Sequence, residues 1–321
     1  MWVWALFISL IGVFLALDLG VFNKGSHEIS YKEATRWTIL WTSVGLLFSF
    51  VILMIYKYQV GPGATGNTPW QACMEYLTGY VIELTLSVDN IFVIALIFRS
   101  FSIPKKYQHR VLFWGILGAL VFRGLMIVFG VYLISKFSWT SYVFGIFLIL
   151  TALKMAFSKE EDKFDPRNSF IYRSIRKILP VSSHLNGENF FIKKRNIVIA
   201  TPLFLALVLI EFTDILFALD SIPAILGITR DPFLVFTSNI FAILGLRSMY
   251  FFIANMLDSF HYLKHSLTVI LIYVGVKLIL ENHFHLNIGI SLSVIFFSLL
   301  VGILLSLKYK ESHGIHDLKN N

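Results

Sequence analysis

The stretch Leu209-Ile-Glu-Phe-Thr-Asp-Ile-Leu-Phe-Ala-Leu-Asp-Ser-Ile-Pro-Ala-Ile225 contains three carboxylates in a run that is otherwise almost wholly apolar. These carboxylates are Glu211, Asp214 and Asp220. A charged side chain at the centre of a bilayer costs roughly 2.5–3.5 kcal/mol on insertion scales. If the stretch spans a membrane, its three acids are too costly to serve packing alone, and they indicate a binding site.

A second stretch repeats this pattern earlier in the chain. Tyr80-Val-Ile-Glu-Leu-Thr-Leu-Ser-Val-Asp-Asn-Ile-Phe-Val-Ile94 contains Glu83 and Asp89, again among apolar side chains. Ionisable groups inside a membrane usually mark substrate or ion pathways. The two stretches together therefore predict one site that is built from both.

The composition fixes the class of protein. Hydrophobic residues make up 57% of the 321 positions and charged residues only 14%, which predicts an all-α polytopic membrane protein with about nine transmembrane helices. The net charge of +8 is typical of cytoplasmic loops in such a protein, and we expect no nucleic-acid partner. A single cysteine, Cys73, excludes an intramolecular disulfide and a zinc site made of several thiolates.

Apolar windows that approach the length of a membrane span give the helix order. They lie near residues 2–19, 36–56, 76–98, 111–134, 139–157, 198–219, 233–257, 265–281 and 286–307. The predicted units are 1–57 with the first two helices, 76–157 with helices three to five, a basic loop at 158–197, 198–281 with helices six to eight, 286–307 with helix nine, and a polar tail at 308–321. We expect short surface helices or irregular chain in the basic loop.

Lysine and arginine gather in alternate loops, most densely at 158–197. Basic loops stay in the cytoplasm, so the pattern predicts an external N-terminus and a cytoplasmic C-terminus. An odd number of helices also requires opposite ends. Two separate readings of the sequence therefore agree on the orientation.

The two acidic stretches head a weak internal repeat. Aligning Asp89 with Asp220 also aligns Glu83 with Asp214, because both pairs are six residues apart. The next two helices in each unit carry a basic residue in or near the end of an apolar run. These residues are Arg123 and Lys154 in the first unit, and Arg247 and Lys277 in the second. Helices three to five therefore match helices six to eight, and an odd repeat length predicts an inverted repeat of the kind found in secondary transporters.

Transporters of this kind bind substrate near the midplane, at interrupted helices. Pro223 cannot donate the helical hydrogen bond toward Leu219, which predicts a break just after Asp220. We expect local unwinding at residues 89–90 and 220–221, where freed backbone carbonyls would add oxygen ligands.

The predicted site contains only oxygen donors. The candidate ligands are Glu83, Asp89, Asn90, Glu211, Asp214 and Asp220, with Ser221 and Asn239 as possible additions. Such a set favours Mn²⁺, Mg²⁺ or Ca²⁺ over Cu⁺ or a selective zinc site. One alternative is that the acids pair with Arg123 and Arg247 to assemble the helices. A combined hypothesis is that these arginines neutralise the acids until a divalent cation or protons displace them.

The motifs resemble the TerC family of integral membrane proteins, and within it the bacterial Alx-type branch. The resemblance rests on residues 83–93, 200–203 and 211–225, and on Thr237-Ser-Asn-Ile-Phe-Ala-Ile-Leu-Gly-Leu-Arg-Ser-Met-Tyr250. It implies a bacterial inner-membrane protein related to the lysine-exporter superfamily, with manganese efflux linked to pH homeostasis and metal detoxification. By matching motif, it implies that the transport acids are Glu83, Asp89, Glu211, Asp214 and Asp220.

The sequence also limits the energy source and the competing functions. No G-x-x-x-x-G-K-[ST] motif occurs, so a transporter of this kind would use a gradient or a partner. We expect a proton-coupled exporter of a divalent cation, with Mn²⁺ as substrate, no organic cofactor and no enzymatic activity. One alternative is a membrane partner that delivers metal to secreted metalloenzymes. Another is an intramembrane aspartyl protease, although the Gly-x-Gly-Asp signature is absent.

Overall fold

The computed structural model describes residues 2–20, 29–60, 66–137, 139–157, 169–182, 184–194, 197–254, 263–280 and 288–319. Ten helices and one two-stranded sheet occur in this part of the chain. They are α1 (Trp2–Gly20), α2 (Tyr31–Lys57), α3 (Pro69–Ser100), α4 (Lys105–Lys136), α5 (Thr140–Phe157), α6 (Phe170–Ile178), β1 (Phe191–Lys194), β2 (Ile197–Ala200), α7 (Pro202–Leu226), α8 (Pro232–Ile253), α9 (Leu263–Leu280) and α10 (Ile288–Lys319).

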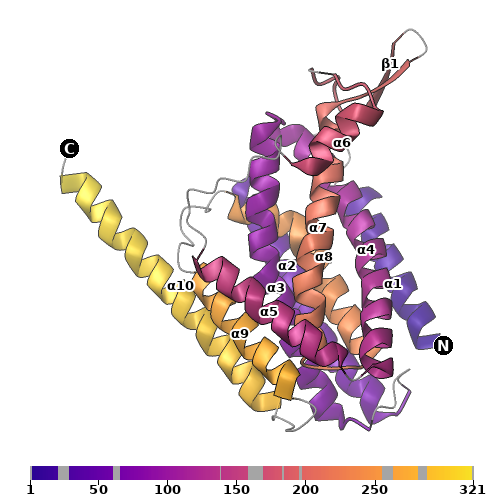
Figure 1. Ribbon diagram of the computed structural model, residues 1–321, viewed down its shortest axis with the longest axis vertical. Coiled ribbons are helices and arrows are strands. Elements are labelled where there is room, and N and C mark those ends of the chain that lie inside the picture. The colour runs from indigo at the N-terminus through magenta and orange to yellow at the C-terminus, as the bar shows by residue number, and fades with distance from the viewer. Residues whose placement is uncertain are drawn as a thin grey trace.

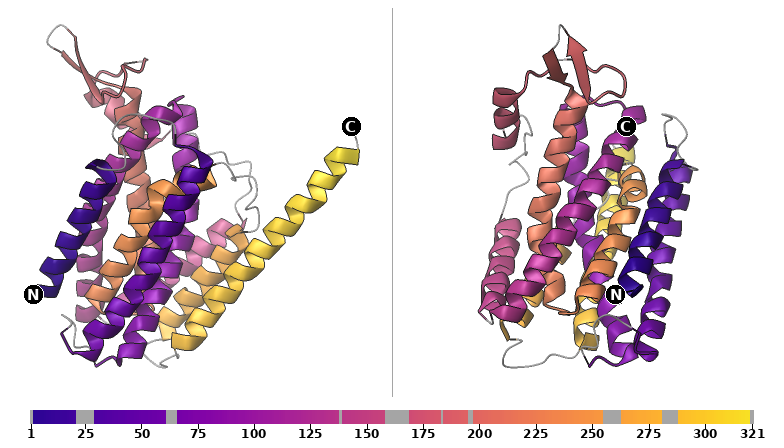
Figure 2. Two further views of the ribbon diagram at one scale, coloured as in Figure 1. Left: turned by 180° about the vertical axis from the view of Figure 1, so that it is seen from behind. Right: turned by 90° about the vertical axis from the view of Figure 1, so that its right-hand side faces the viewer.

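Nine of these helices form one bundle, and α6 with the β1–β2 hairpin lies at one end of it (Figure 1). Helix α1 begins near the opposite end, whereas α10 runs back toward the hairpin end (Figure 2). Seven described helices are long and apolar enough to cross a membrane, and α1 and α9 contribute shorter apolar segments. The nine helices expected from the apolar windows are thus confirmed as elements of a polytopic all-α fold.

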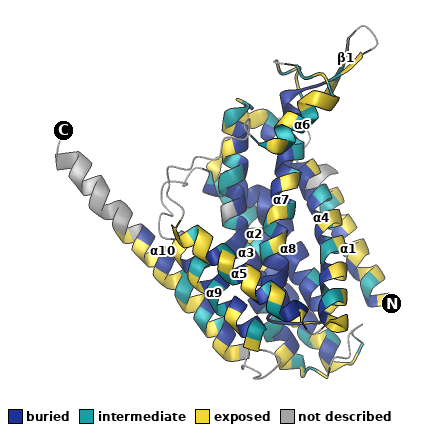
Figure 3. Ribbon diagram, viewed as in Figure 1, coloured by how far each residue is buried: buried dark blue, intermediate teal, exposed yellow. Residues whose placement is uncertain are grey.

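Helix α8 is the centre of the bundle. In its apolar window 89% of the residues are buried, compared with 22% in α10. It packs against α2, α3 and α4, whereas α1, α5 and α10 turn many exposed side chains outward (Figure 3). Those outward side chains are largely apolar, as expected for a surface that faces lipid rather than water.

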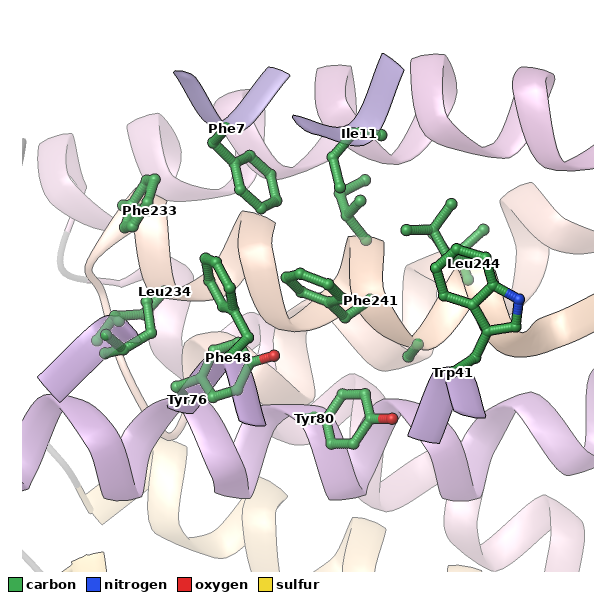
Figure 4. Close-up of a cluster of buried hydrophobic side chains, with 14 of the residues drawn as sticks. Phe7, Ile11, Trp41, Phe48, Tyr76, Tyr80, Phe233, Leu234, Phe241 and Leu244 are labelled. Carbon is green, nitrogen blue, oxygen red and sulfur yellow. The ribbon is translucent and has the colours of Figure 1, made fainter. Parts of the chain in front are cut away.

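Aromatic side chains hold the first two helices onto α8 (Figure 4). The rings of Phe48 and Phe241 have centroids 4.5 Å apart, and Phe7 meets Phe241 edge-on at 6.0 Å. Tyr76 lies in the same cluster and donates a hydrogen bond of 2.8 Å to the carbonyl of Gly45. Offset and edge-on rings add about 0.5–1.5 kcal/mol per pair beyond their buried area. This cluster fixes α2, α3 and α8 side by side.

Helices α5 and α9 cross at two glycines. A Cβ atom at Gly145 would lie 2.6 Å from the carbonyl oxygen of Gly275, and a Cβ atom at Gly275 would lie 2.8 Å from the carbonyl oxygen of Gly145. Small residues at such crossings let two backbones approach closely. Packing of α5 on the rest of the bundle therefore depends on the absence of a side chain at both positions.

We expect Gly145→Ala to destabilise the fold by about 1–3 kcal/mol, because the added methyl group forces the two helices apart. Gly12→Ala is the matched control, since nothing lies within 4 Å of a Cβ atom there. The control should be neutral or stabilise the helix by up to about 1 kcal/mol. Thermal unfolding in detergent would measure both variants, and equal midpoints would contradict the close crossing.

The predicted unwinding in helices three and six is wrong. Helix α3 is continuous from Pro69 to Ser100, and α7 continues through Pro223 to Leu226. No glycine or proline lies between residues 80 and 100 to interrupt α3. In α7 only one turn follows Pro223, and the side chains of that turn are buried. Pro223 has no backbone N–H and so leaves the carbonyl of Leu219 without its helical hydrogen bond, a loss that packing against neighbouring helices makes tolerable.

The basic loop contains one expected and one unexpected element. Helix α6 is a short surface helix, as predicted, but β1 and β2 form an antiparallel hairpin in which Phe191 pairs with Ala200 and Lys194 with Ile197. Each strand has only four residues, too few for an alternating pattern to identify it. Helix α10 likewise extends to Lys319 and includes most of the polar tail.

Candidate functional site

The centre of the candidate site is Arg123 of α4, which is 1% exposed. Its guanidinium donates from Nε to Oδ2 of Asp214 at 3.1 Å and from Nη2 to Oδ1 at 2.7 Å. Its Nη1 forms a buried ion pair with Glu83 Oε1. Paired hydrogen bonds of this type fix both the charge and the orientation of a carboxylate. One arginine therefore joins α3 and α7, the two helices that carry the acidic stretches.

Two amide side chains complete the cluster. Asn90 of α3 donates to Asp214 Oδ1 at 3.0 Å, and Arg123 Nη1 donates to Asn239 Oδ1 of α8 at 3.3 Å. The amide of Asn239 is oriented by its own bond to the carbonyl of Val235, at 2.9 Å. Carboxylate and amide groups from α3, α7 and α8 thus meet around one guanidinium from α4. We call Glu83, Asn90, Arg123, Asp214 and Asn239 the Arg123 cluster.

The Arg123 cluster retains oxygen atoms that could accept further bonds. Glu83 Oε2 and Asn90 Oδ1 have no hydrogen-bond partner among the described residues, although both side chains are at most 1% exposed. A buried acceptor that stays unsatisfied costs about 1–3 kcal/mol. Both atoms are hard oxygen donors, so the cluster has the chemistry that Mn²⁺, Mg²⁺ and Ca²⁺ prefer.

Glu211 lies one turn before Asp214 on α7 and packs against α4. Its carboxylate rests on the backbone of Gly118, where any Cβ atom would overlap with it. The Oε2 atom of Glu211 is buried and has no hydrogen-bond partner in the described part of the chain. Gly118 therefore makes the space that this acid occupies beside the Arg123 cluster.

Asp220 lies on a different side of α7. Six residues separate it from Asp214, which corresponds to about 9 Å along the axis and a net rotation of about 240°. Its Oδ1 accepts a hydrogen bond of 3.2 Å from Thr151 of α5. The neighbouring Ser221 is buried, and its Oγ has no partner among the described residues.

The other predicted site residues are placed less directly. The backbone of Asp89 is helical, but its side chain lies outside the described residues. Arg247 lines a small cavity with Glu33 and Trp41 between α2 and α8. It is two turns, or about 12 Å, from Asn239 along α8. The charge-balancing role predicted for Arg247 stays a prediction, whereas Arg123 contacts two of the predicted acids.

Among the described side chains, no group of three or more His, Cys, Asp or Glu residues is arranged to hold a metal ion. The Arg123 cluster instead brings together two carboxylates, two amides and one guanidinium. In this arrangement the guanidinium lies between the two carboxylates and pairs with both of them.

Sequence reasoning missed two residues that shape the site, Gly118 and Thr151. Gly118 lies in the run Gly115-Ile-Leu-Gly-Ala119, whose three small residues signal close helix packing. Thr151 lies one turn before Lys154 in an apolar helix. Its hydroxyl group, a hydrogen-bond donor among apolar side chains, was the signal that could have identified it.

The sequence profile of the integral membrane protein TerC family matches residues 68–313, which include every residue of the Arg123 cluster. The chain belongs to the TerC family. A Myxococcus xanthus protein named uncharacterized membrane protein STKORF319 is 46% identical over 292 residues, covering 91% of this chain and 88% of its own. No solved structure matches the chain.

Two further TerC-family relatives carry the name membrane-bound redox modulator Alx. The Photorhabdus laumondii protein is 41% identical over 315 residues, covering 97% of both chains. The Escherichia coli K12 protein is 42% identical over 294 residues, covering 91% of this chain and 90% of its own. The resemblance to the TerC family and its Alx branch is therefore confirmed along nearly the whole chain.

Proposed function

We propose that this TerC-family chain is a secondary transporter that exports a divalent cation, with Mn²⁺ as the favoured substrate, in exchange for protons. The observation that carries the proposal is the Arg123 cluster, in which buried carboxylates and amides surround a guanidinium and two of their oxygens, Glu83 Oε2 and Asn90 Oδ1, have no hydrogen-bond partner among the described residues. Groups of this kind within membrane spans mark ion pathways more often than packing contacts.

The charges of the cluster support exchange between a cation and protons. Glu83 and Asp214 carry two negative charges when ionised, and Arg123 balances one of them. Uncompensated charge is strongly disfavoured in a dry interior, so the second carboxylate needs a proton or a bound cation. Cation uptake with proton release, followed by the reverse, keeps the cluster near neutrality in both states.

Arg123 is the internal counter-ion in this mechanism. While no substrate is bound, its guanidinium holds Glu83 and Asp214 at a fixed distance across the α3–α7 interface. A divalent cation competes for the same oxygens and displaces the guanidinium. Release of the cation lets Arg123 return, so the site has two alternative occupants rather than an open binding cavity.

The helix packing supports the inverted repeat. The repeat matches α3 with α7 and α4 with α8. Helix α3 packs on α8 and α7 packs on α4, so each helix makes the same contact as its counterpart in the other unit. Helices α5 and α9, the third helix of each unit, pack on one another.

We place the protein in a bacterial inner membrane with the N-terminus outside, because the basic loops lie at the hairpin end.

A flux assay tests the proposal. Purified protein in proteoliposomes should transport Mn²⁺ in preference to Mg²⁺, Ca²⁺ and Zn²⁺, and an imposed proton gradient should change the rate. We expect Asp89→Asn and Asp220→Asn to lower the Mn²⁺ flux, because each removes one of the predicted transport acids. Glu188→Gln is the control, since Glu188 lies outside the spans and forms a partly exposed ion pair with Arg110.

Undiminished Mn²⁺ flux in both aspartate variants would remove these acids from the mechanism. Absence of flux for all four cations in the wild-type protein would favour the alternative of a partner that delivers metal to secreted metalloenzymes. The redox role in the names of the Alx relatives has less support in this chain. Its only cysteine is the buried Cys73, so no pair of thiols exists within the chain.

A further inference from the structure

Helix α6 has two chemically distinct faces, although none of its residues is buried. Its apolar residues recur at the spacing i, i+4, i+7 and its basic residues at i, i+3, i+4, which places the two sets on nearly opposite faces. The first set is Ile171, Ile175 and Ile178, and the second is Arg173, Arg176 and Lys177. Phe170 and Ile178, at the two ends, are 80% and 79% exposed. Water is an unfavourable surrounding for such large apolar side chains.

Contacts with the bundle fix the level at which α6 lies. The ring of Tyr172 is 5.9 Å from that of Phe101, the residue that follows the end of α3. Helix α6 also packs on α7, near whose first turn it lies in Figures 1 and 2. This level is where the apolar spans α3 and α7 end and begin, and there a bilayer changes from acyl chains to headgroups.

Positive charge also lies beside α6. Residues 169–182 contain three basic residues, all on α6, and no acid, and the acid Glu188 farther along the chain is paired with Arg110 at 3.3 Å. The adjoining ends of α3 and α4 add the exposed side chains Arg99, Lys105 and Lys106. An exposed surface with this charge attracts anionic groups.

We propose that α6 is an interfacial helix that binds anionic phospholipid at the hairpin end of the bundle. The exposed side chains Phe170 and Ile178 enter the boundary of the acyl chains, whereas Ile171 packs against the bundle. Arg173, Arg176 and Lys177 contact the lipid phosphates. Arginine and lysine on the polar face of a short amphipathic helix are suited to this arrangement. This inference does not depend on the transported substrate.

Lipid rather than an acidic soluble protein is the occupant because apolar and basic groups are exposed together at the edge of the spans. A soluble partner would need to cover Phe170 and Ile178 at the level where the apolar spans end and a bilayer would meet water. The segment that follows α6 is tied to the start of α7, since the backbone of Ala200 in β2 hydrogen-bonds to Pro180 and Ser182 and α7 starts two residues later.

The test uses the full-length protein in nanodiscs that contain phosphatidylcholine alone or mixed with phosphatidylglycerol. Two measurements are made, namely amide hydrogen exchange in α6 and retention of phosphatidylglycerol by native mass spectrometry. For the wild-type protein we expect slower exchange in α6 when phosphatidylglycerol is present. In the triple variant Arg173→Gln/Arg176→Gln/Lys177→Gln, phosphatidylglycerol retention should fall by on the order of a hundredfold, because each of the three basic side chains near an anionic surface contributes about fivefold.

The matched control neutralises three exposed basic residues at the other end of the bundle, as Lys57→Gln/Lys136→Gln/Arg230→Gln. It should keep the wild-type lipid preference. Equal exchange in both nanodiscs, or equal loss of lipid in the two triple variants, would overturn the proposal. The proposal would also be overturned if inorganic phosphate slowed amide exchange in α6 as strongly as phosphatidylglycerol does, because α6 would then be a general anion site.

Discussion

Arg123→Gln will lower the free energy of unfolding by about 3–5 kcal/mol, because it leaves two buried carboxylates without their counter-ion. The loss should be partly reversed by millimolar Mn²⁺. A divalent cation can take the position of the missing guanidinium between Glu83 and Asp214. Wild-type protein should gain less stability from Mn²⁺, since its own guanidinium must first be displaced. Thermal unfolding in detergent, with and without Mn²⁺, Mg²⁺ and Ca²⁺, measures the effect.

Arg110→Gln is the control for this result. Arg110 also pairs with a glutamate, at 3.3 Å, but both side chains are about one-third exposed. An exposed pair contributes about 0–1 kcal/mol, so this variant should lose little stability and should respond to Mn²⁺ as the wild-type protein does. A similar loss in the two arginine variants, or no cation-dependent recovery in Arg123→Gln, would contradict the role of Arg123 as an internal counter-ion.

The sequence predicted the helices and several partners in the site because both follow from the cost of polar groups in a membrane. Apolar windows located all nine bundle helices, and an arginine in the middle of one of them required a buried acid as partner. Helix spacing alone could not say which acid. That choice depends on how α3, α4 and α7 rotate against one another, and the contacts of Arg123 with Glu83 and Asp214 resolve it.

Other features could not be predicted because they depend on packing between distant segments. Pro223 has the same local chemistry in a broken helix and in a continuous one, and the burial of its surroundings favours the continuous helix. Asp220 faces Thr151, which is 69 residues away in sequence. The β1–β2 hairpin has strands of four residues, and its pairing is visible only in three dimensions.

Asp214→Asn will reduce Mn²⁺ flux to the level of protein-free liposomes while the protein remains folded. Asp214 accepts three of the hydrogen bonds that hold the Arg123 cluster together, two from Arg123 and one from Asn90. The substitution keeps the shape of the side chain and removes its charge, so Glu83 and Arg123 remain as a neutral pair. The surplus negative charge that would attract a cation is then gone. Losing even an outer-shell partner of a metal ligand costs roughly 10–100-fold in affinity, and we expect at least this loss.

A double variant separates transport from helix assembly. If Asp214 serves only to neutralise Arg123, then Arg123→Gln/Asp214→Asn should recover stability relative to Arg123→Gln and should also recover Mn²⁺ flux. If the two residues form the cation site, the double variant should be more stable than Arg123→Gln, because one buried carboxylate rather than two is left unpaired, but it should not recover flux. Unfolding and flux measured on the same four proteins give the coupling energy of the pair. Recovery of flux in the double variant would assign the ion pair to assembly alone, because transport would then need neither the carboxylate nor the guanidinium.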